Sequence, residues 1–184
     1  MSNNTVRVPP LAVERFSEEQ ARLVGDWKHL IFSRVLIHSP RMYRTFVAHL
    51  AELIARTNLP PRDRQIICLR MLELCNEVYE KTHHITISRK VGLSDEEISA
   101  ILKGQGACLT SFDRTVLKAT DELFLEQRIS DATWGKLAER YSRQQLMEIV
   151  FLAGCYQTMA MLTKSFGMQL EPDLESFNAL RKYE

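Results

Sequence analysis

The stretch PRDRQIICLRMLELCNEVYEKTHHITISRKVG, residues 61 to 92, decides how the chain folds. Proline is favoured at the first position of a helix and glycine just beyond its end, so this spacing predicts one long helix from about Pro61 to Lys90, stopped by Gly92. Elsewhere the glycines and prolines lie between segments of helical period, and we find no strand-like alternation of any length. The sequence therefore predicts an all-α fold, a multi-helix bundle with a long central helix.

Capping signals locate the remaining helices. Ser17 and Ser94 are followed three positions later by Gln20 and Glu97, the pattern of a capping box at a helix start. We expect further helices at about residues 17–37, 39–56, 94–103, 112–127, 130–141 and 142–167. The 184 residues also suggest an irregular arm at 1–16, a single helical domain at 17–173 and a C-terminal tail at 174–184.

The composition is that of an ordinary soluble globular protein, with 45% hydrophobic and 26% charged residues. A net charge of +1 provides no overall field to attract nucleic acid or an anionic membrane, so neither is expected as a partner. The N-terminus lacks the apolar segment of a signal peptide, and the most apolar run, residues 146–162, is short for a membrane span. We expect a buried core helix there, and a cytoplasmic protein.

The four cysteines form no CxxC pair and have no zinc-ligand spacing with histidine; they are Cys68, Cys75, Cys108 and Cys155. On one helix, the seven positions between Cys68 and Cys75 correspond to about 10 Å, too far for a disulfide. We therefore expect reduced, mostly buried thiols, with no metal and no cofactor.

The predicted long helix has two faces when its residues are spaced at about 100°. One is a core stripe of Cys68, Met71, Leu72, Cys75, Val78, Tyr79, Thr82 and Ile85, with His83 at its edge. The opposite face contains Glu73, Glu77, Glu80 and His84. On this second face, Glu80 precedes His84 by one turn, which makes the two side chains neighbours.

Two interpretations of the second face stay open. It is either a solvated surface with a weak Glu–His pair, or a covered one, because Ile66 and Leu69 precede its polar residues and Ile87 follows them. On a covered face, burial would raise the pKa of a carboxylate and a nearby imidazolium would lower it. A Glu80–His84 pair there could exchange a proton near neutral pH.

Residues 59–101, LPPRDRQIICLRMLELCNEVYEKTHHITISRKVGLSDEEISAI, resemble the carboxymuconolactone decarboxylase family, also called the AhpD-like (alkylhydroperoxidase D-like) family. Further similar segments are DRTVLKATDEL at 113–123, ISDATWGKLAERY at 129–141 and LMEIVFLAGCYQTMAMLTKSFGMQLEP at 146–172, so the resemblance spans about residues 15–173. It implies an AhpD-like helical fold that assembles as a homo-oligomer, a dimer, trimer or hexamer, with its site near subunit contacts.

The peroxidase branch of that family uses a Glu, then a CxxC pair, then a His four positions after the second Cys. Aligned on His84, the two cysteine positions fall at Glu77 and Glu80, and the upstream Glu falls at Gln65. Dithiol peroxide reduction needs a thiolate and a resolving partner, and neither stands at these positions. The resemblance therefore implies a branch without the CxxC motif and without dithiol peroxidase activity.

The decarboxylase branch also lacks the CxxC pair and works with acid–base residues. Similarity to it implies a carboxy-lyase acting on a small organic acid of lactone type, with His84 as proton shuttle and Glu80 as its orienter. The candidates for catalysis are His84, Glu80 and Glu77. The candidates for substrate binding are Arg70, Glu73, Gln65, Tyr79 and His83, with Arg89 as a further carboxylate ligand.

Other functions are compatible with parts of the sequence. A family member that only binds a ligand or a partner is one alternative, and a residual alkylhydroperoxidase (peroxiredoxin-type) activity is another. Residues 85–101, ITISRKVGLSDEEISAI, also resemble a helix-turn-helix. Its second helix would begin with Asp95, Glu96 and Glu97, however, and would direct three carboxylates at DNA phosphates, which argues against DNA binding.

Overall fold

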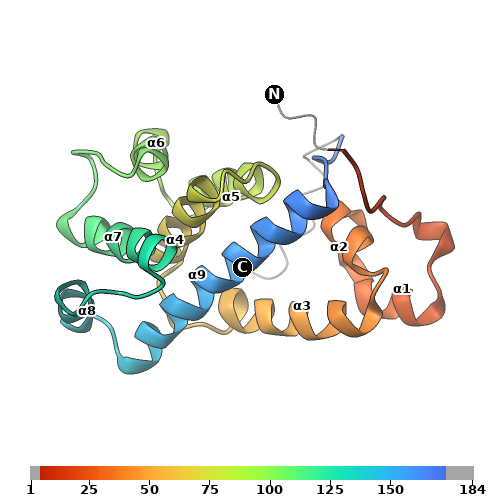
Figure 1. The fold of residues 1–184 in the computed structure, drawn as a ribbon, viewed down its shortest axis with the longest axis horizontal. Helices are drawn as coiled ribbons and strands as arrows, with labels where there is room; N and C mark the ends of the chain where they lie inside the picture. Colours follow the sequence, from red (N-terminus) through yellow and green to blue (C-terminus); the bar gives the residue numbers. More distant parts are fainter. Residues whose placement is uncertain (1–4, 173–184) are drawn as a thin grey trace. The chain divides into compact units, whose positions relative to one another are not determined.

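The computed structural model describes residues 5–172, and every regular element in that range is helical (Figure 1). Two short 3₁₀-helices, η1 (Val13–Arg15) and η2 (Gly25–His29), accompany α1 (Glu18–Val24), α2 (Ile31–Leu36), α3 (Pro40–Ala55), α4 (Pro61–Leu74), α5 (Tyr79–Lys90), α6 (Asp95–Lys103), α7 (Ser111–Glu126), α8 (Asp131–Ala138) and α9 (Arg143–Phe166). The predicted all-α fold is confirmed.

The chain separates into two compact units. Unit 1 comprises Met1–Arg56 and Met161–Glu184, and unit 2 comprises Thr57–Ala160. The predicted boundaries of arm, domain and tail stay predictions, and the tail at 174–184 lies outside the described residues. All candidate site residues belong to unit 2.

The prediction of one long helix from Pro61 to Lys90 is wrong, because the helix ends at Leu74 and a new one starts at Tyr79. Asn76 adopts a left-handed conformation with φ of 49°. The N–H of Asn76 donates to the carbonyl of Glu73 at 2.8 Å, and that of Glu77 donates to the carbonyl of Leu72 at 2.9 Å. This pair of bonds is a Schellman motif, which closes a helix and turns the chain away.

Helix α4 is the centre of unit 2 and packs against α5, α6 and α7. Eight of its fourteen residues are buried, and they are not confined to one stripe, because the run from Gln65 to Leu69 is buried without a break. A helix with consecutive buried residues has more than one side covered by its neighbours, which places α4 in the core of unit 2. The wheel drawn over one long helix is therefore inaccurate, and Val78, assigned to the core stripe, is 57% exposed.

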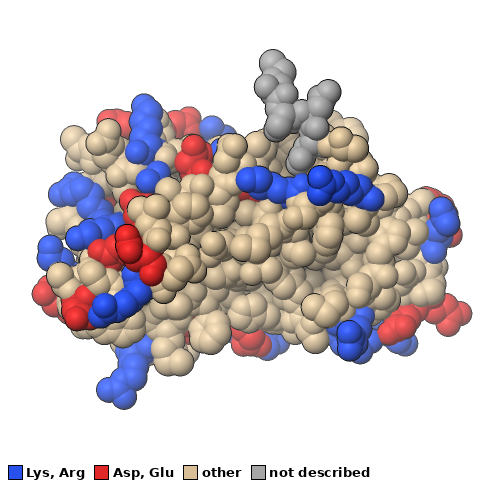
Figure 2. All heavy atoms as spheres, in the orientation of Figure 1, with Lys and Arg blue, Asp and Glu red and all other residues tan. Residues whose placement is uncertain are grey.

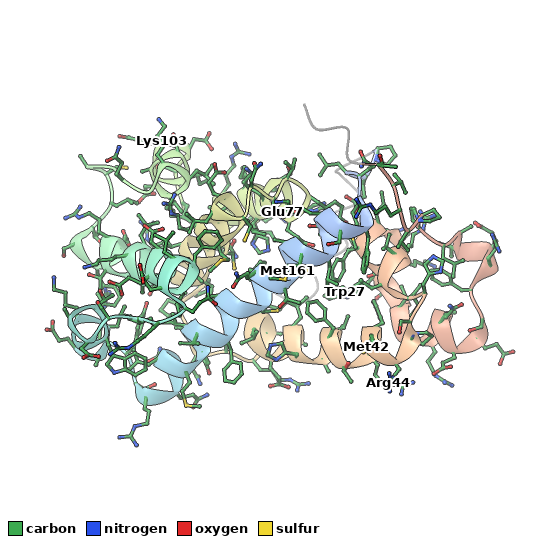
Figure 3. All side chains as sticks on the ribbon, in the orientation of Figure 1. Trp27, Met42, Arg44, Glu77, Lys103 and Met161 are labelled. Atoms are coloured by element: carbon green, nitrogen blue, oxygen red, sulfur yellow. The ribbon has the colours of Figure 1, made fainter. Side chains whose placement is uncertain are left out.

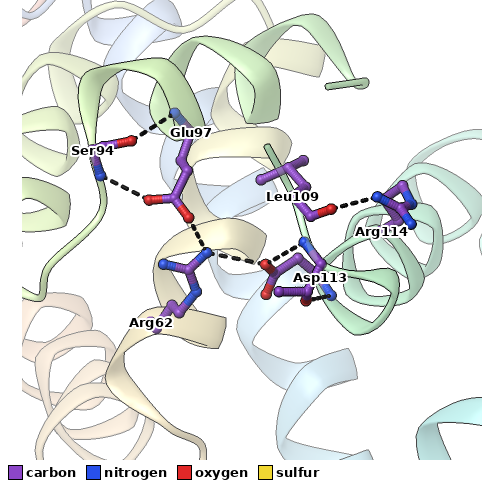
Figure 4. A network of polar contacts seen from close by, with 7 residues as sticks. Arg62, Ser94, Glu97, Leu109, Asp113 and Arg114 are labelled. Carbon is purple, nitrogen blue, oxygen red and sulfur yellow. Dashed lines mark hydrogen bonds and ion pairs between the residues drawn. The ribbon is translucent and has the colours of Figure 1, made fainter. Parts of the chain in front are cut away.

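A polar network fixes the N-terminal end of α4 to two neighbouring helices (Figure 4). The guanidinium of Arg62 donates to Glu97 of α6 at 2.5 Å and to Asp113 of α7 at 3.0 Å. The bond from Arg62, with a further one from the Ser94 backbone, holds the pKa of Glu97 below its ordinary value. Glu97 also completes the predicted capping box with Ser94, so one carboxylate both caps α6 and anchors α4.

In unit 1, the predicted helix over residues 17–37 is interrupted. The capping box of Ser17 and Gln20 is present, but α1 ends at Val24, and Gly25, with φ of 55°, leads into η2 and then α2. With ψ of −131° as well, this backbone conformation is one that only glycine adopts without strain. Val24, Ile37 and Tyr43 form the buried centre of this unit.

Helix α9 contains the apolar run of the sequence. Among the described residues it is the one helix that is long and apolar enough to cross a membrane, yet half of the apolar window is buried inside the protein, as in a core helix. Glu148 accepts a hydrogen bond from the Thr57 hydroxyl at 2.6 Å and one from the Asn58 backbone at 3.1 Å. The carboxylate within the run therefore anchors α9 to the chain segment before α4.

Basic and acidic side chains intermingle over α6, α7 and α8 on the face drawn in Figure 2. On that face unit 2 shows no extended basic surface over these helices, in keeping with the net charge of +1. This mixed distribution of charge does not support the helix-turn-helix alternative, because binding to DNA phosphates depends on clustered Lys and Arg.

Candidate functional site

Glu77 lies between α4 and α5 with an exposed fraction of only 1% (Figure 3). Its two carboxylate oxygens accept hydrogen bonds from the backbone N–H groups of Tyr79 at 2.9 Å and Lys81 at 3.1 Å. The first N–H groups of a helix have no partner within the helix, and a negative charge there is stabilising. Glu77 therefore caps α5, a structural role that the sequence did not reveal.

Glu73 spans the same break from the other side. Its carboxylate forms an ion pair with Nζ of Lys81 at 2.7 Å, which joins the last turn of α4 to the first turn of α5. Both side chains are partly exposed, so this pair contributes little to stability. The structure thus assigns to Glu73 a contact across the helix break.

His84 is buried, with an exposed fraction of 6%. Its Nδ1 lies 2.8 Å from Oε1 of Gln65 on α4, and the Ser88 hydroxyl donates to the same oxygen at 3.3 Å. The ring of Tyr156 on α9 meets the imidazole edge to face, with 4.8 Å between centroids. Burial, aided by the nearby charges of His83 and Arg64, lowers the pKa of His84 to about 3. The imidazole is therefore neutral at physiological pH.

Tyr156 connects His84 to a buried thiol. Its hydroxyl is hydrogen-bonded to Cys68 of α4, and both groups are almost inaccessible to solvent. Burial raises the pKa of the Cys68 thiol and, with the charges of Cys68 and Glu80, that of Tyr156. Burial and the Glu80 charge raise the pKa of Cys155 to about 12. We call Gln65, Cys68, His84, Ser88 and Tyr156 the His84 cluster.

Three further predicted residues occupy places near or beside this cluster. Glu80 is partly buried, and its charge acts on Cys68, Cys155 and Tyr156. Tyr79 and His83 are both buried and stack edge to face, with 4.6 Å between ring centroids. Of the two interpretations of the face that carries Glu77, Glu80 and His84, the burial of Glu77 and His84 favours the covered one.

The two arginines considered for carboxylate binding have other partners. Nε of Arg70 donates to Asp121 of α7 at 2.6 Å, and its Nη1 donates to the carbonyl of Leu102 at 2.8 Å. Arg89 pairs with Asp95 at an exposed position. The structure therefore ties Arg70 to α7 and the end of α6, while Gln65 and His84 come together as a pair.

The chemistry open to this cluster is proton transfer. The imidazole is neutral, and the hydroxyl and thiol beside it are protonated, because their pKa values lie above the ordinary ones. The described residues contain no group of three or more His, Cys, Asp and Glu that could hold a metal ion. Tyr156, Cys68 and Ser88 were not predicted as site residues. The signal available for the first two was a tyrosine and a cysteine at core positions of two apolar helices.

Comparison with known proteins bears on the family and the fold. Residues 40–120 match the carboxymuconolactone decarboxylase family. A crystal structure of a protein of unknown function from Agrobacterium tumefaciens, provisionally described as the antioxidant defence protein AhpD, is similar with a TM-score of 0.68 and 19% identity, over 74% of this chain and 94% of that one. At that identity the similarity concerns the fold. None of the curated proteins matches the chain.

Proposed function

We propose that this chain, which belongs to the carboxymuconolactone decarboxylase family, transfers protons on a small organic acid of lactone type, with His84 as the acid–base group. The observation that carries the proposal is the buried, neutral imidazole held by Gln65 at 2.8 Å. A solvated helix surface would leave such a side chain with a pKa near its ordinary value and without a buried partner.

A decarboxylation needs a group that moves one proton, and we assign that role to His84. The neutral imidazole takes the proton of the substrate's carboxylic acid, the bond between the carboxyl carbon and the adjacent carbon breaks, and carbon dioxide leaves. The bonding electron pair stays on the adjacent carbon, and the imidazolium returns the proton to it. Burial lowers the pKa of His84 to about 3, so the imidazole takes a proton only from a group as acidic as a carboxylic acid and then returns it readily to carbon.

The geometry modifies one role expected from the sequence. Gln65, not Glu80, is the residue found within hydrogen-bonding distance of Nδ1 of His84. We assign to Glu80 an electrostatic role, because its charge disfavours ionisation of Cys68, Cys155 and Tyr156. A site that keeps these groups protonated is suited to substrates that lose and regain a proton.

A thiol-based peroxidase activity is disfavoured by the same observations. Reaction with a peroxide requires a thiolate, and burial raises the pKa of both Cys68 and Cys155. Glu77, at the position of the first thiol in the peroxidase branch, is engaged as a helix cap. The dithiol chemistry of that branch is therefore not part of the proposal.

The test is a proton-transfer assay with a panel of unsaturated lactone carboxylic acids. Proton NMR in D₂O would follow substrate loss and deuterium incorporation at carbon, and carbon dioxide release would be measured in parallel. We expect turnover by the native chain, a loss of at least about 100-fold in His84→Asn, and no change in His49→Asn, a histidine exposed on α3. Turnover that persists in folded His84→Asn would overturn the proposal. Saturable binding without turnover of any acid would support the ligand-binding alternative.

We also propose that the chain forms a homo-oligomer, with a second copy covering the exposed side of α9 in unit 2. Met147, Val150 and Phe151 are 54%, 42% and 55% exposed there, and they form an apolar row that ends at Gly154. A Cβ added to Gly154 would meet nothing within 4 Å, so another helix could approach closely. Light scattering should give the mass of a multimer for the native chain and of a monomer for Phe151→Glu, and a monomeric native chain would refute the proposal.

A further inference from the structure

Gln65 presents its amide oxygen to two donors inside unit 2. Oε1 lies 2.8 Å from Nδ1 of His84 and accepts from the Ser88 hydroxyl at 3.3 Å. A carbonyl oxygen has no hydrogen to donate, so a hydrogen bond in this arrangement requires a proton on Nδ1. All three residues are buried, with exposed fractions of 6% or less, so water does not compete readily for these groups.

We infer that Gln65 is a positioning residue that keeps the proton of neutral His84 on Nδ1 and leaves Nε2 as the basic nitrogen. The tautomer follows from the hydrogen bond alone, whereas its catalytic consequence rests on the proposed function. In that function, Nε2 accepts the substrate proton and returns it to carbon. A change of tautomer would place a hydrogen where the lone pair is needed.

The amide group matters as much as the position. A carboxylate in the place of Gln65, which the family resemblance gives to the peroxidase branch, would stabilise an imidazolium and raise the pKa of His84. A neutral amide orients the ring without adding charge. The groups that act on the imidazole agree with this arrangement, because His83 on α5 and Arg64 on α4 both disfavour its protonation, and Tyr156 on α9 contributes an uncharged ring.

Gln65 also connects α4 to α5. Gln65 belongs to α4, whereas His84 and Ser88 stand one turn apart on α5. Two donors on consecutive turns of one helix thus converge on one oxygen of the other. The Ser88 hydroxyl donates to the same oxygen that faces the imidazole and so helps to hold the amide in place. Ser88 should therefore matter less than Gln65, but in the same direction.

The tautomer is measured without substrate. Nitrogen-15 NMR of the chain labelled at histidine distinguishes protonated from unprotonated ring nitrogens, and the His84 signals are assigned by their loss in His84→Asn. We expect the native chain to show a protonated Nδ1 and an unprotonated Nε2 at pH 7. Gln65→Met, which removes the amide at similar length, should shift the population toward the other tautomer. Ser88→Ala should shift the population in the same direction, but less.

Gln65→Glu separates orientation from charge. It should retain the Nδ1 proton and raise the pKa of His84 by about 1–3 units, as an adjacent carboxylate does. Once a substrate is known, Gln65→Met should lower kcat at least about tenfold with little change in KM. Gln65→Glu should restore part of that loss and shift the pH dependence of kcat to higher pH.

Two results would overturn the inference. A native His84 with its proton on Nε2 would mean that the amide presents its NH₂ group, and an unchanged tautomer in folded Gln65→Met would mean that the glutamine does not set it. Because these measurements need no turnover, they stand even if no lactone acid proves to be a substrate. A correct tautomer together with an inactive panel would instead count against the proposed function.

Discussion

Replacing Glu77 with alanine removes the carboxylate that caps α5. Its oxygens accept from the backbone N–H of Tyr79 at 2.9 Å and of Lys81 at 3.1 Å, and the side chain is 1% exposed. The N–H at buried Tyr79 would be left without a partner, which costs about 2 kcal/mol, and the N–H at half-buried Lys81 would add about 1 kcal/mol. We therefore expect Glu77→Ala to lower the free energy of unfolding by roughly 3 kcal/mol.

Urea unfolding followed by circular dichroism measures this loss, and amide hydrogen exchange at Tyr79 and Lys81 locates it. Glu77→Gln keeps one acceptor oxygen and should lose about half as much. Glu96→Ala is the matched control, since this glutamate is exposed in the first turn of α6, and it should stay within about 0.5 kcal/mol of the native chain. A Glu77→Ala variant as stable as that control would refute the capping role.

Three further outcomes follow from the same structure. Folded His84 has a pKa of about 3 against 6.5 ordinarily, so the unfolded state binds its proton first as the pH falls. Stability should therefore drop between pH 6.5 and 3 by up to about 1.4 kcal/mol per pH unit, and urea unfolding of His84→Gln should show a flatter pH dependence. Asn76 has a φ of 49°, so Asn76→Gly should be neutral or stabilising in thermal melts, and Asn76→Ala should cost about 1 kcal/mol. Cys68 should react with iodoacetamide at pH 7 at least about 100-fold more slowly in the native chain than after unfolding, as followed by mass spectrometry, because the buried thiol has a raised pKa.

The sequence predicted helices wherever a strong local signal marks their ends. The capping boxes at Ser17 and Ser94 and the loop before α7 all appear in the structure. The prediction failed at residues 75–78, because the residue that ends α4 is Asn76, a weaker stop signal than glycine. Because one continuous helix was predicted, Glu77 was placed in the middle of a helix face, and its role as a cap at the start of α5 was not predicted.

The candidate site was predictable in part. The pairing of Gln65 with His84 joins two residues that the family resemblance had singled out, although sequence spacing alone gave no reason to connect them. The contact of His84 with Tyr156 and the bond of Tyr156 with Cys68 were missed. Such contacts link helices far apart in the chain, and periodicity within one helix carries no information about them.

The two positions where the resemblance places thiols now have separate roles. Glu77 is buried, and its carboxylate accepts hydrogen bonds from the first backbone N–H groups of α5, the helix that carries His84. Glu80 is partly exposed and acts by its charge on Cys68, Cys155 and Tyr156. One glutamate therefore fixes where the histidine stands, and the other adds its charge to the burial that keeps the groups around it protonated. In the proposed function, the two positions would support an acid–base site, one through the backbone of α5 and the other through its charge.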